Sequence, residues 1–244
     1  AHRPARAARP SRPRVASMRA VAEPVPVADM PARISVVIPA LNEAENILAT
    51  LQALQPLRGR GHEVIVVDGG SSDRTRELAL PLADQVISAP RGRGRQINAG
   101  VAQAQGAILW FLHADTVAGS NADEAICQAL VGSGRDWGRF NVRLSGKHLL
   151  LRVVETMMNL RSCLTGIATG DQGIFVQRAL FEAVGGFPEL PLMEDIALCR
   201  RLRHHSRPVC LRHRLTTSSR RWDEKGIIRT VALMWWLRLR FHFG

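Results

Sequence analysis

The stretch Ala107–Thr116, AILWFLHADT, decides the fold that we predict for this chain. Its apolar part is as long as one strand, and an unbroken apolar run is typical of a strand covered on both faces of a parallel sheet. The run ends in the polar tetrad HADT at residues 113–116. Ligands of open α/β sheets collect at the carboxyl ends of the strands, so we expect metal or phosphate chemistry at Asp115.

Two strands are predicted before this stretch. The β-branched run ISVVI at Ile34–Ile38 predicts a central parallel strand that ends at Pro39. The run at Glu63–Val67 predicts a second strand, which leads directly into Asp68. Because the carboxyl ends of parallel strands share one edge of the sheet, we expect Asp68 to face the same crevice as Asp115.

Predicted helices alternate with these strands. Asn42 is expected to cap the first helix and Ser72 the second, because both side chains can accept hydrogen bonds from free backbone amides. A short strand at Gln85–Ser88 and a helix at Gln96–Gln105 continue the alternation. This order is typical of right-handed strand–helix–strand units, so we predict an α/β fold with a mostly parallel, Rossmann-like sheet flanked by helices.

Composition limits the domain organisation. The chain has 244 residues, 46% hydrophobic and 22% charged, which suits one large domain, alone or with a small appendage. We expect a disordered basic tail at 1–33, a folded domain at 34–224 and an apolar, basic helix at 225–244. The four cysteines show no CxxC pair, which favours buried thiols in a reducing cytoplasm over a disulfide framework or a zinc site.

The formal net charge of +12 favours an anionic partner: a nucleic acid, an anionic membrane surface or a nucleotide diphosphate. The loop Pro90–Gly100, PRGRGRQINAG, places three arginines between glycines and leads into a predicted helix. Such a loop is either a solvated basic segment or a cradle of guanidinium groups and backbone amides around an anion. Its pattern does not match a P-loop.

Five segments, in this order, resemble the family 2 glycosyltransferases of the GT-A fold, the fold of nucleotide-diphospho-sugar transferases. They are ISVVIPALNE, VVDGGSSDRT, the arginine and glycine loop ending in NAG, FLHADT and LMEDIAL. The resemblance runs from Ile34 to Trp222. The loop, the His-Ala-Asp triplet and the segment SSRRW at 218–222 are most similar to a bacterial subgroup named for radical-SAM and selenodomain neighbours or for arsenosugar biosynthesis.

The resemblance implies a nucleotide-binding set at the sheet edge. Asp68 matches the acid that recognises uracil or another base, and Arg93 stands where the family usually has a lysine near the diphosphate. Pro39 and Asn42 match residues that line the pocket, although they also fit a strand end and a helix cap. The full set is Pro39, Asn42, Glu43, Asp68, Gly70, Arg93, Asn98 and His113.

Asp115 matches the last acid of the DXD motif, which in the family holds a divalent cation on the donor diphosphate. Hard oxygen donors suit Mn²⁺ or Mg²⁺, which stabilises charge on the leaving diphosphate. His113 stands in place of the first acid. It either contacts the ribose, adds a nitrogen ligand that favours Mn²⁺, or is a strand-end histidine held by backbone hydrogen bonds.

The resemblance further implies that Asp195 is the catalytic base, with Glu194 as its neighbour or substitute. An inverting transfer needs a carboxylate opposite the leaving diphosphate to take the acceptor proton. The alternative is that this pair caps the apolar helix that follows it. The residues implied to contact the acceptor or the donor sugar are Asp171, Gln172, Arg221 and Trp222. The alternative for Asp171 is that it caps a turn between glycines, and the alternative for Trp222 is that it packs against the sheet.

The C-terminal segment KGIIRTVALMWWLRLRFHFG at 225–244 combines basic and aromatic residues on a predicted helix. Such a helix can lie in a membrane interface, but its pattern is imperfect, because Arg238 points nearly opposite to Arg229 and Arg240. The alternative is packing onto the domain or onto a partner subunit of a homo-oligomer. No apolar run reaches the ~20 residues of a membrane-spanning helix, so any membrane contact is expected to be peripheral.

We therefore expect an inverting, metal-assisted glycosyltransferase that moves a sugar from a nucleotide diphosphate, preferably UDP, to a small or lipid-like acceptor in the cytoplasm. One alternative is glycosylation of a carotenoid acid or lipid at the inner face of the cell membrane. A sugar nucleotidylyltransferase would carry a glycine-rich signature directly after the first strand, where this chain has PALNE. A nucleic-acid-binding module would interleave aromatic residues with the arginines; none occurs between Val64 and Leu109, so we expect no nucleic-acid partner.

Overall fold

The computed structural model describes residues 32–243 of the chain, and the side chains of residues 32–241. Residues 1–31 of the predicted basic tail lie outside the described part. The described residues belong to one contact unit, so the C-terminal helix shares that unit with the sheet.

A mixed sheet organises the described residues, in the strand order β3-β2-β1-β4-β7-β6-β8-β5. The pairs β2–β3, β1–β2 and β1–β4 are parallel. β7 runs antiparallel to both β4 and β6, β6 pairs in parallel with β8, and β5 is antiparallel to β8. The strands are β1 (Ile34–Ala40), β2 (Glu63–Asp68), β3 (Gln85–Ser88), β4 (Ile108–Phe111), β5 (Thr116–Val117), β6 (Trp137–Leu144), β7 (Phe175–Gln177) and β8 (Val209–Thr217).

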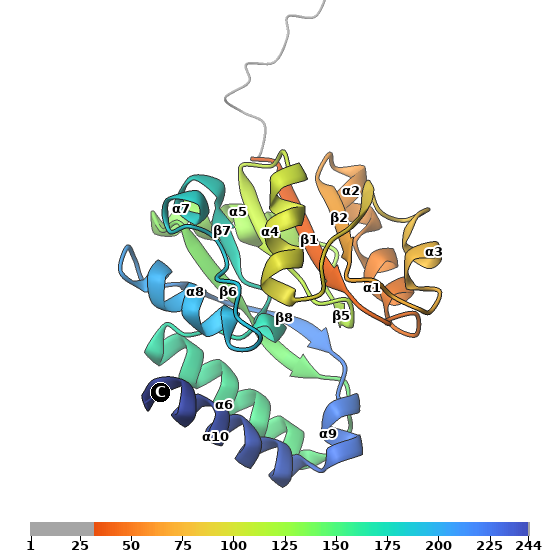
Figure 1. The fold of residues 1–244 in the computed structure, drawn as a ribbon. Helices are drawn as coiled ribbons and strands as arrows, with labels where there is room; N and C mark the ends of the chain where they lie inside the picture. The colour runs from red at the N-terminus through yellow and green to blue at the C-terminus, as the bar shows by residue number, and fades with distance from the viewer. Residues whose placement is uncertain (1–31, 244) are drawn as a thin grey trace, which may run out of the picture. The chain divides into compact units, whose positions relative to one another are not determined.

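Helices cover both faces of this sheet (Figure 1). One face packs against α1, α2, α3 and α5, through buried side chains such as Ile47 and Ile126. The other face packs against α4, α7 and α8, through Ile97, Phe181 and Leu198. The helices are α1 (Ile47–Ala53), α2 (Gln55–Gly59), α3 (Thr75–Ala79), α4 (Arg93–Gln103), α5 (Ala122–Ser133), α6 (Leu149–Thr165), the 3₁₀ turn η2 (Gly170–Gln172), α7 (Arg178–Ala183), α8 (Glu194–Arg203), α9 (Arg220–Lys225) and α10 (Ile227–Phe243).

The predicted α/β fold is confirmed, and β1 to β4 occur where the apolar runs predicted them. Pro39, however, does not end the first strand. β1 continues to Ala40, whose carbonyl oxygen accepts a hydrogen bond from Gly69 N at 2.9 Å. Because of this extra pairing, β1 and β2 end at the same edge of the sheet, where Ala40 lies opposite Asp68.

The predicted helix caps at Asn42 and Ser72 are wrong. α1 and α3 begin later, after Asn46 and Arg74. Asn42 has a left-handed φ of 54°, and its side-chain oxygen accepts a hydrogen bond from Ser72 N at 2.9 Å. This hydrogen bond joins the turn after β1 to the turn after β2, so neither residue starts a helix.

Helix α4 begins at Arg93, three positions before the predicted helix, so the arginine loop supplies its first turn. Gly100 of this helix rests directly on β1 and β2, because a Cβ there would lie 2.8 Å from the Val67 side chain. Glycine therefore allows α4 to sit close to the sheet and holds its amino end at the carboxyl edge of the strands.

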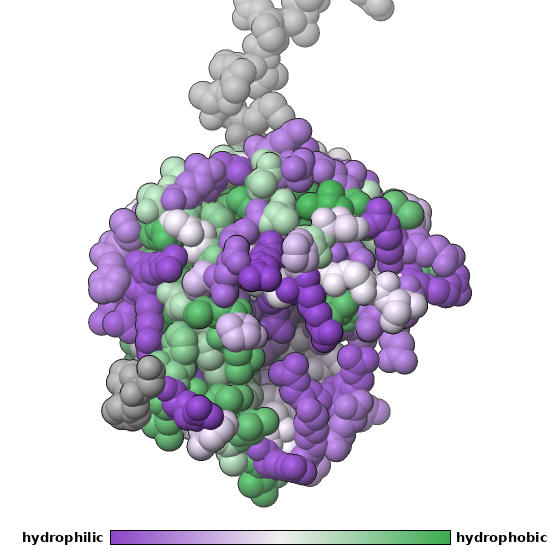
Figure 2. Space-filling view, in the orientation of Figure 1, coloured by the Kyte–Doolittle hydropathy of each residue, from purple (hydrophilic) through white to green (hydrophobic). Residues whose placement is uncertain are grey.

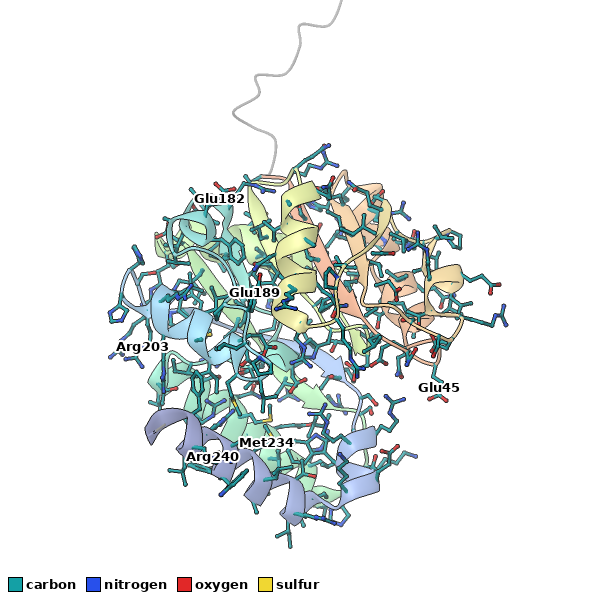
Figure 3. All side chains as sticks on the ribbon, viewed as in Figure 1. Glu45, Glu182, Glu189, Arg203, Met234 and Arg240 are labelled. Atoms are coloured by element: carbon teal, nitrogen blue, oxygen red, sulfur yellow. The ribbon has the colours of Figure 1, made fainter. Side chains whose placement is uncertain are left out.

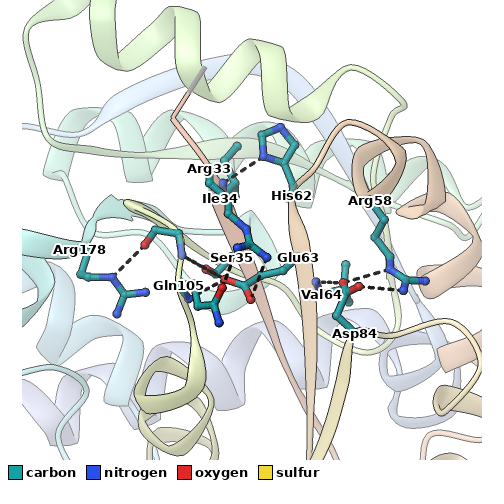
Figure 4. A network of polar contacts seen from close by, with 11 residues as sticks. Arg33, Ile34, Ser35, Arg58, His62, Glu63, Val64, Asp84, Gln105 and Arg178 are labelled. Carbon is teal, nitrogen blue, oxygen red and sulfur yellow. Dashed lines mark hydrogen bonds and ion pairs between the residues drawn. The ribbon is translucent and has the colours of Figure 1, made fainter. Parts of the chain in front are cut away.

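The opposite edge of the sheet is held by carboxylates in a polar network (Figure 4). Glu63, which is 2% exposed, accepts hydrogen bonds from Ser35 Oγ at 2.5 Å and from Gln105 N at 2.6 Å. Asp84 accepts from Val64 N at 2.7 Å and from the Arg58 guanidinium at 2.8 and 3.0 Å. These contacts satisfy the charges at this edge and fix the β1–β3 end of the sheet.

Candidate functional site

A cleft of about 550 Å³ opens at the carboxyl edge of the sheet. β1, the turn after β4, the starts of α4 and α8, η2, α9 and α10 all contribute to its walls. Most of the predicted site residues meet there. Those that line the cleft are Pro39, Glu43, Arg93, His113, Asp115, Asp171, Glu194, Asp195, Arg221 and Trp222.

Asp68, Asn42 and Gly70 lie beside the cleft rather than in its wall. Asp68 is 5% exposed. Its carboxylate accepts hydrogen bonds from Gly70 N at 3.1 Å and from Ser71 N. Gly70 adopts a φ of 89°, a left-handed value that glycine tolerates without strain. The turn after β2 is therefore built around the Asp68 carboxylate, one strand away from the lining residue Ala40.

Two predicted site residues have other partners. Asn98 donates a hydrogen bond to Phe187 O at 2.8 Å and accepts one from Phe187 N at 3.1 Å, so it fastens α4 to the loop before α8. Gln172 is fully buried and donates to Ser162 Oγ at 2.8 Å. Its side chain fastens η2 to α6 and does not line the cleft.

Asp115 lies in the turn between β4 and β5, and its carboxylate faces the cleft. One oxygen accepts long hydrogen bonds from the Thr116 and Thr217 hydroxyls, at 3.4 and 3.3 Å. The backbone oxygen of Asp115 accepts from Ser218 N at 3.1 Å. The other carboxylate oxygen has no hydrogen-bond partner among the described residues, so it is free to bind a cation.

His113 is held by a side chain, which corrects the expectation of backbone hydrogen bonds. Its Nδ1 lies 3.1 Å from Asp171 Oδ1, and its Nε2 is buried without a partner among the described residues. Burial opposes ionisation of Asp171, yet the hydrogen bond from His113 and the charges of His113, Arg93 and Arg221 hold its pKa below the usual range. Asp171 therefore stays ionised.

Asp195 lies in the first turn of α8, next to η2. Its carboxylate accepts hydrogen bonds from Gly170 N at 2.9 Å and from Ile196 N at 2.7 Å. Burial raises its pKa, and the neighbouring charge of Glu194 raises it further. The N-cap of α8 is Met193, at a φ of 68° and without a side-chain hydrogen bond, so the acidic pair lies in the first turn of α8, where Asp195 also satisfies the free amide of Ile196.

Glu194 is 2% exposed and pairs with Arg93, whose Nη1 lies 3.0 Å from Glu194 Oε1. This ion pair joins the start of α4 to the start of α8. It also brings a positive charge to Asp195, where it opposes part of the rise in pKa. The arginine loop thus provides a specific partner for the acidic pair.

Helix α10 contributes to the cleft, which the sequence did not predict. Met234, Leu237 and Arg238 line the cleft from this helix, and Figure 3 labels Met234. Burial lowers the pKa of Arg238, while the charges of Asp195 and Asp171 oppose this change. The available signal was the position of Arg238 on the helix face opposite to Arg229, since that face turns toward the acids.

Trp222 both packs inside the fold and lies in the cleft wall. It is 7% exposed and packs with Leu144 and Leu151 in a small cluster, while part of it lines the cleft. Arg220, beside it on α9, lies 3.2 Å from Glu45 and 3.9 Å from Glu43. These exposed pairs connect α9 to the loop after β1.

The fold is of the GT-A type, as two solved structures indicate. S. aureus TarS 1–349 superposes with a TM-score of 0.63 at 19% identity, over 77% of this chain and 60% of that one. Glucosyl-3-phosphoglycerate synthase from Mycobacterium tuberculosis, in complex with Mn²⁺, UDP and glucosyl-3-phosphoglycerate, gives a TM-score of 0.56 at 22% identity, over 76% of this chain and 71% of that one.

Residues 35–138 match the family model of Glycosyl transferase family 2. Glycosyltransferase AglE from Haloferax volcanii is 31% identical over 64% of this chain. The alignment covers 56% of AglE, so the chain spans little more than half of this relative. The matched segment contains β1 to β4, and it ends before Asp171, Asp195 and α10.

Among the described residues, no three His, Cys, Asp or Glu side chains form a group that could hold a metal ion by themselves. None of the described helices is both long and apolar enough to span a bilayer. The four cysteines are free thiols, but the prediction that they are buried holds fully only for Cys199. Cys127 and Cys210 are partly exposed, and the prediction is wrong for Cys163, which is exposed.

Proposed function

We propose that this protein is an inverting glycosyltransferase that moves a sugar from a nucleotide-diphosphate donor, preferably a UDP-sugar, to a hydroxyl of a small or lipid-like acceptor. One observation carries the proposal: Asp195, with a raised pKa, faces the same cleft as Asp171, with a lowered pKa, and as Asp115. Acids whose pKa values are pushed apart in one cleft are typical of a division between a proton-transferring group and a permanently charged group.

In this proposal Asp195 is the general base. As the acceptor oxygen attacks the anomeric carbon, Asp195 takes its proton, and the bond from that carbon to the donor diphosphate breaks. The nucleoside diphosphate leaves with the electron pair, so a single displacement inverts the anomeric centre. The raised pKa makes Asp195 a stronger base while it is ionised, and Gly170 N and Ile196 N hold its carboxylate in one orientation.

The donor is proposed to lie along the β1–β4 edge. Asp68 would receive the base, and Arg93 and Arg221 would face the diphosphate, because guanidinium groups bind phosphate oxygens in pairs. Glu194 would hold Arg93 in place through their 3.0 Å pair. Pro39, Asn42 and Glu43 would shape the adjoining wall, and Asp171 would contact the donor sugar or the acceptor.

Asp115 fits a role in binding Mn²⁺ or Mg²⁺, because one of its oxygens is free of described partners and faces the cleft. A hard cation in a nucleotide site takes one or two protein carboxylates and completes its shell with phosphates and waters, so a three-residue protein cluster is not required. Such a cation would stabilise negative charge on the leaving diphosphate. His113, with Nδ1 committed to Asp171, would face the ribose rather than the cation.

The remaining assignments belong to the same proposal. We infer a catalytic domain at 34–224 with a C-terminal helix at 225–244, a cytoplasmic location, and membership of the bacterial subgroup named for radical-SAM and selenodomain neighbours. A carotenoid-acid or lipid acceptor is the second candidate, supported by the apolar residues Met234 and Leu237 in the cleft wall. Neither a nucleotidylyltransferase nor a nucleic-acid-binding module would require the acid pair at 194–195.

The test is thermal unfolding with UDP. UDP should raise the melting temperature much more with Mn²⁺ than with EDTA, and Asp115→Asn should remove that difference. Glu182→Gln, on the exposed acid of α7, is the matched control and should behave as the unaltered chain does. Equal shifts with Mn²⁺ and EDTA would contradict the metal role, and the absence of any UDP effect would contradict the proposed function.

A further inference from the structure

Helix α6 carries a row of apolar side chains on its outer face. The exposed members are Leu149, Leu150, Val153, Met157, Leu160 and Leu164, with Leu149 80% exposed. Their spacing of three and four residues places most of them on one stripe of the helix. The buried face of α6 uses other positions, including Leu151 and Met158, so this second apolar stripe is not needed for packing inside the fold.

Helix α10 carries a matching stripe. Its exposed large apolar side chains are Ile228, Leu233, Trp235, Trp236 and Leu239, and Trp235 is 56% exposed. The opposite side of the helix packs inward or lines the cleft. α6 and α10 lie side by side (Figure 1), and Figure 2 shows hydrophobic side chains gathered in the region of these two helices. We call the two stripes together the α6/α10 face.

The charge around this face has one sign. On α10, Arg229 and Arg240 are exposed among the apolar side chains, and Arg240 lies over the Trp236 ring at 5.0 Å. Lys147 is exposed just before α6. Among the described residues of the two helices, Glu155 is the single acidic residue. It is 7% exposed and forms an ion pair with the Arg152 guanidinium at 3.0 Å.

The imperfect amphipathic pattern of the C-terminal helix now has an explanation. Arg238, which interrupts the pattern, lines the cleft, so the exposed half of α10 carries apolar side chains with Arg229 and Arg240 among them. The acids Asp223 and Glu224 lie on α9 before this helix, where Arg220, Arg221 and Lys225 outnumber them. The exposed half of α10 therefore combines tryptophan, aliphatic and basic side chains without an acid among its described residues.

We propose that the α6/α10 face binds the surface of an anionic lipid bilayer. Exposed apolar patches of this extent mark interaction sites, and a protein partner would be expected to meet the arginines with acids in one fixed arrangement. An anionic bilayer accepts both features at once, because tryptophan and aliphatic side chains enter the interfacial layer while arginines contact lipid phosphates. The uniform sign of the charge therefore favours a lipid surface over a second copy of this basic chain, which would bring like charges together.

The position of α10 gives this surface a role beyond the proposed function. One side of the helix faces outward with Trp235 and Leu239, while the other lines the cleft with Met234, Leu237 and Arg238. Docking would therefore bring the cleft wall close to the bilayer. An acceptor anchored in the membrane could then reach Asp195 without leaving the interface; this last step rests on the proposed function, whereas lipid binding does not.

The experiment measures sedimentation of the chain with vesicles, without donor or metal. Vesicles of equal parts phosphatidylglycerol and phosphatidylcholine should carry the chain down, and vesicles of phosphatidylcholine alone should bind it at least about tenfold more weakly. Leu160→Glu and Trp235→Glu should each weaken binding about tenfold or more, because each places a charge in the apolar stripe. The double variant Arg229→Gln, Arg240→Gln should weaken it about tenfold.

Val131→Glu is the matched control, because Val131 is 86% exposed on α5, on another element, and it should bind as the unaltered chain does. The variants replace exposed side chains, and circular dichroism with UDP-dependent thermal shift checks that each has folded. Equal binding by Trp235→Glu and Val131→Glu, or no binding to anionic vesicles, would overturn the proposal. A monomer–dimer equilibrium abolished by Leu160→Glu, without vesicle binding, would overturn it in favour of a contact between copies. None of these outcomes changes the UDP measurement that tests the proposed function.

Discussion

Replacing Arg93 by glutamine tests the electrostatics of the acidic pair most directly. Glu194 is 2% exposed, and Arg93 Nη1 at 3.0 Å is its ion-pair partner. Removing one member of a fully buried ion pair lowers the free energy of unfolding by about 3–5 kcal/mol, whereas removing one member of a surface ion pair lowers it by less than about 1 kcal/mol. The Arg93 side chain is 42% exposed, so solvent screens part of the effect and we expect a loss of about 2 kcal/mol.

The same substitution should shift the pH dependence of transfer. Burial and Glu194 raise the pKa of Asp195, and the Arg93 charge opposes this rise. Without Arg93 the pKa of Asp195 should rise further. Since the base must be ionised, activity disappears as pH falls through this pKa, and the acidic limb of the kcat/KM profile should move to higher pH.

Arg95→Gln is the control, because Arg95 lies on the same helix and pairs with Glu189 at 2.8 Å, with both side chains more than half exposed. Urea unfolding should show a loss of about 0.5 kcal/mol or less for this variant, and its acidic limb should not move. The position of the limb, rather than the maximal rate, is the readout, since Arg93 is also proposed to bind phosphate. Identical profiles for the two variants would refute the electrostatic coupling between Arg93 and Asp195.

Further predictions concern the base, the sheet and the His113 contact. Asp195→Asn should retain the UDP-dependent thermal shift but lose transfer about 10²–10⁴-fold, and normal turnover with a verified acceptor would rule Asp195 out as the base. Asp84→Asn should lower the free energy of unfolding at pH 7 by about 1 kcal/mol. Burial opposes ionisation of Asp84, but the Arg58 hydrogen bonds and the Val64 amide hold its pKa below the usual range, so in urea titrations the deficit should begin to shrink near about pH 4 and disappear only as the pH falls through this lowered pKa; a pH-independent deficit would contradict this reasoning. Gly170→Ala should destabilise the chain by about 1–3 kcal/mol, because a Cβ there collides with His113 Nε2, and the cost should largely disappear in a His113→Ala background; an equal cost in both backgrounds would exclude the collision.

The parallel half of the sheet was predictable because its strands are continuous apolar runs. β1, β2 and β4 are buried on both faces, so their sequences are mostly apolar. The length of each apolar run then identifies it as a strand. The acids at the carboxyl edge follow from the same rule, so Asp68 and Asp115 could be placed before the structure was known. Here local sequence and tertiary environment agree.

The antiparallel half was not predictable in the same way, because its pairings depend on contacts distant in sequence. β7 inserts between β4 and β6, and nothing in a three-residue strand specifies those neighbours. The Asn42–Ser72 bond likewise joins two loops 30 residues apart, and it overrides the local preference of both residues for helix caps. The pairing of His113 with Asp171 spans 58 residues and left no local signal.

The antiparallel pairing of β7 with β4 joins the parallel strands β1–β4 to the later segment of the chain. The family match at 35–138 covers β2, β3, β4 and nearly all of β1 and ends within β6, whereas Asp171, Asp195 and Arg238 all come from the segment after it. A chimera that exchanges this later segment between related chains should therefore transfer acceptor choice and leave unchanged the choice of donor base, for which Asp68 is proposed. Such an exchange must preserve the contacts between the two segments, among them His113 with Asp171, Arg93 with Glu194 and Asn98 with Phe187, as well as the β4–β7 pairing.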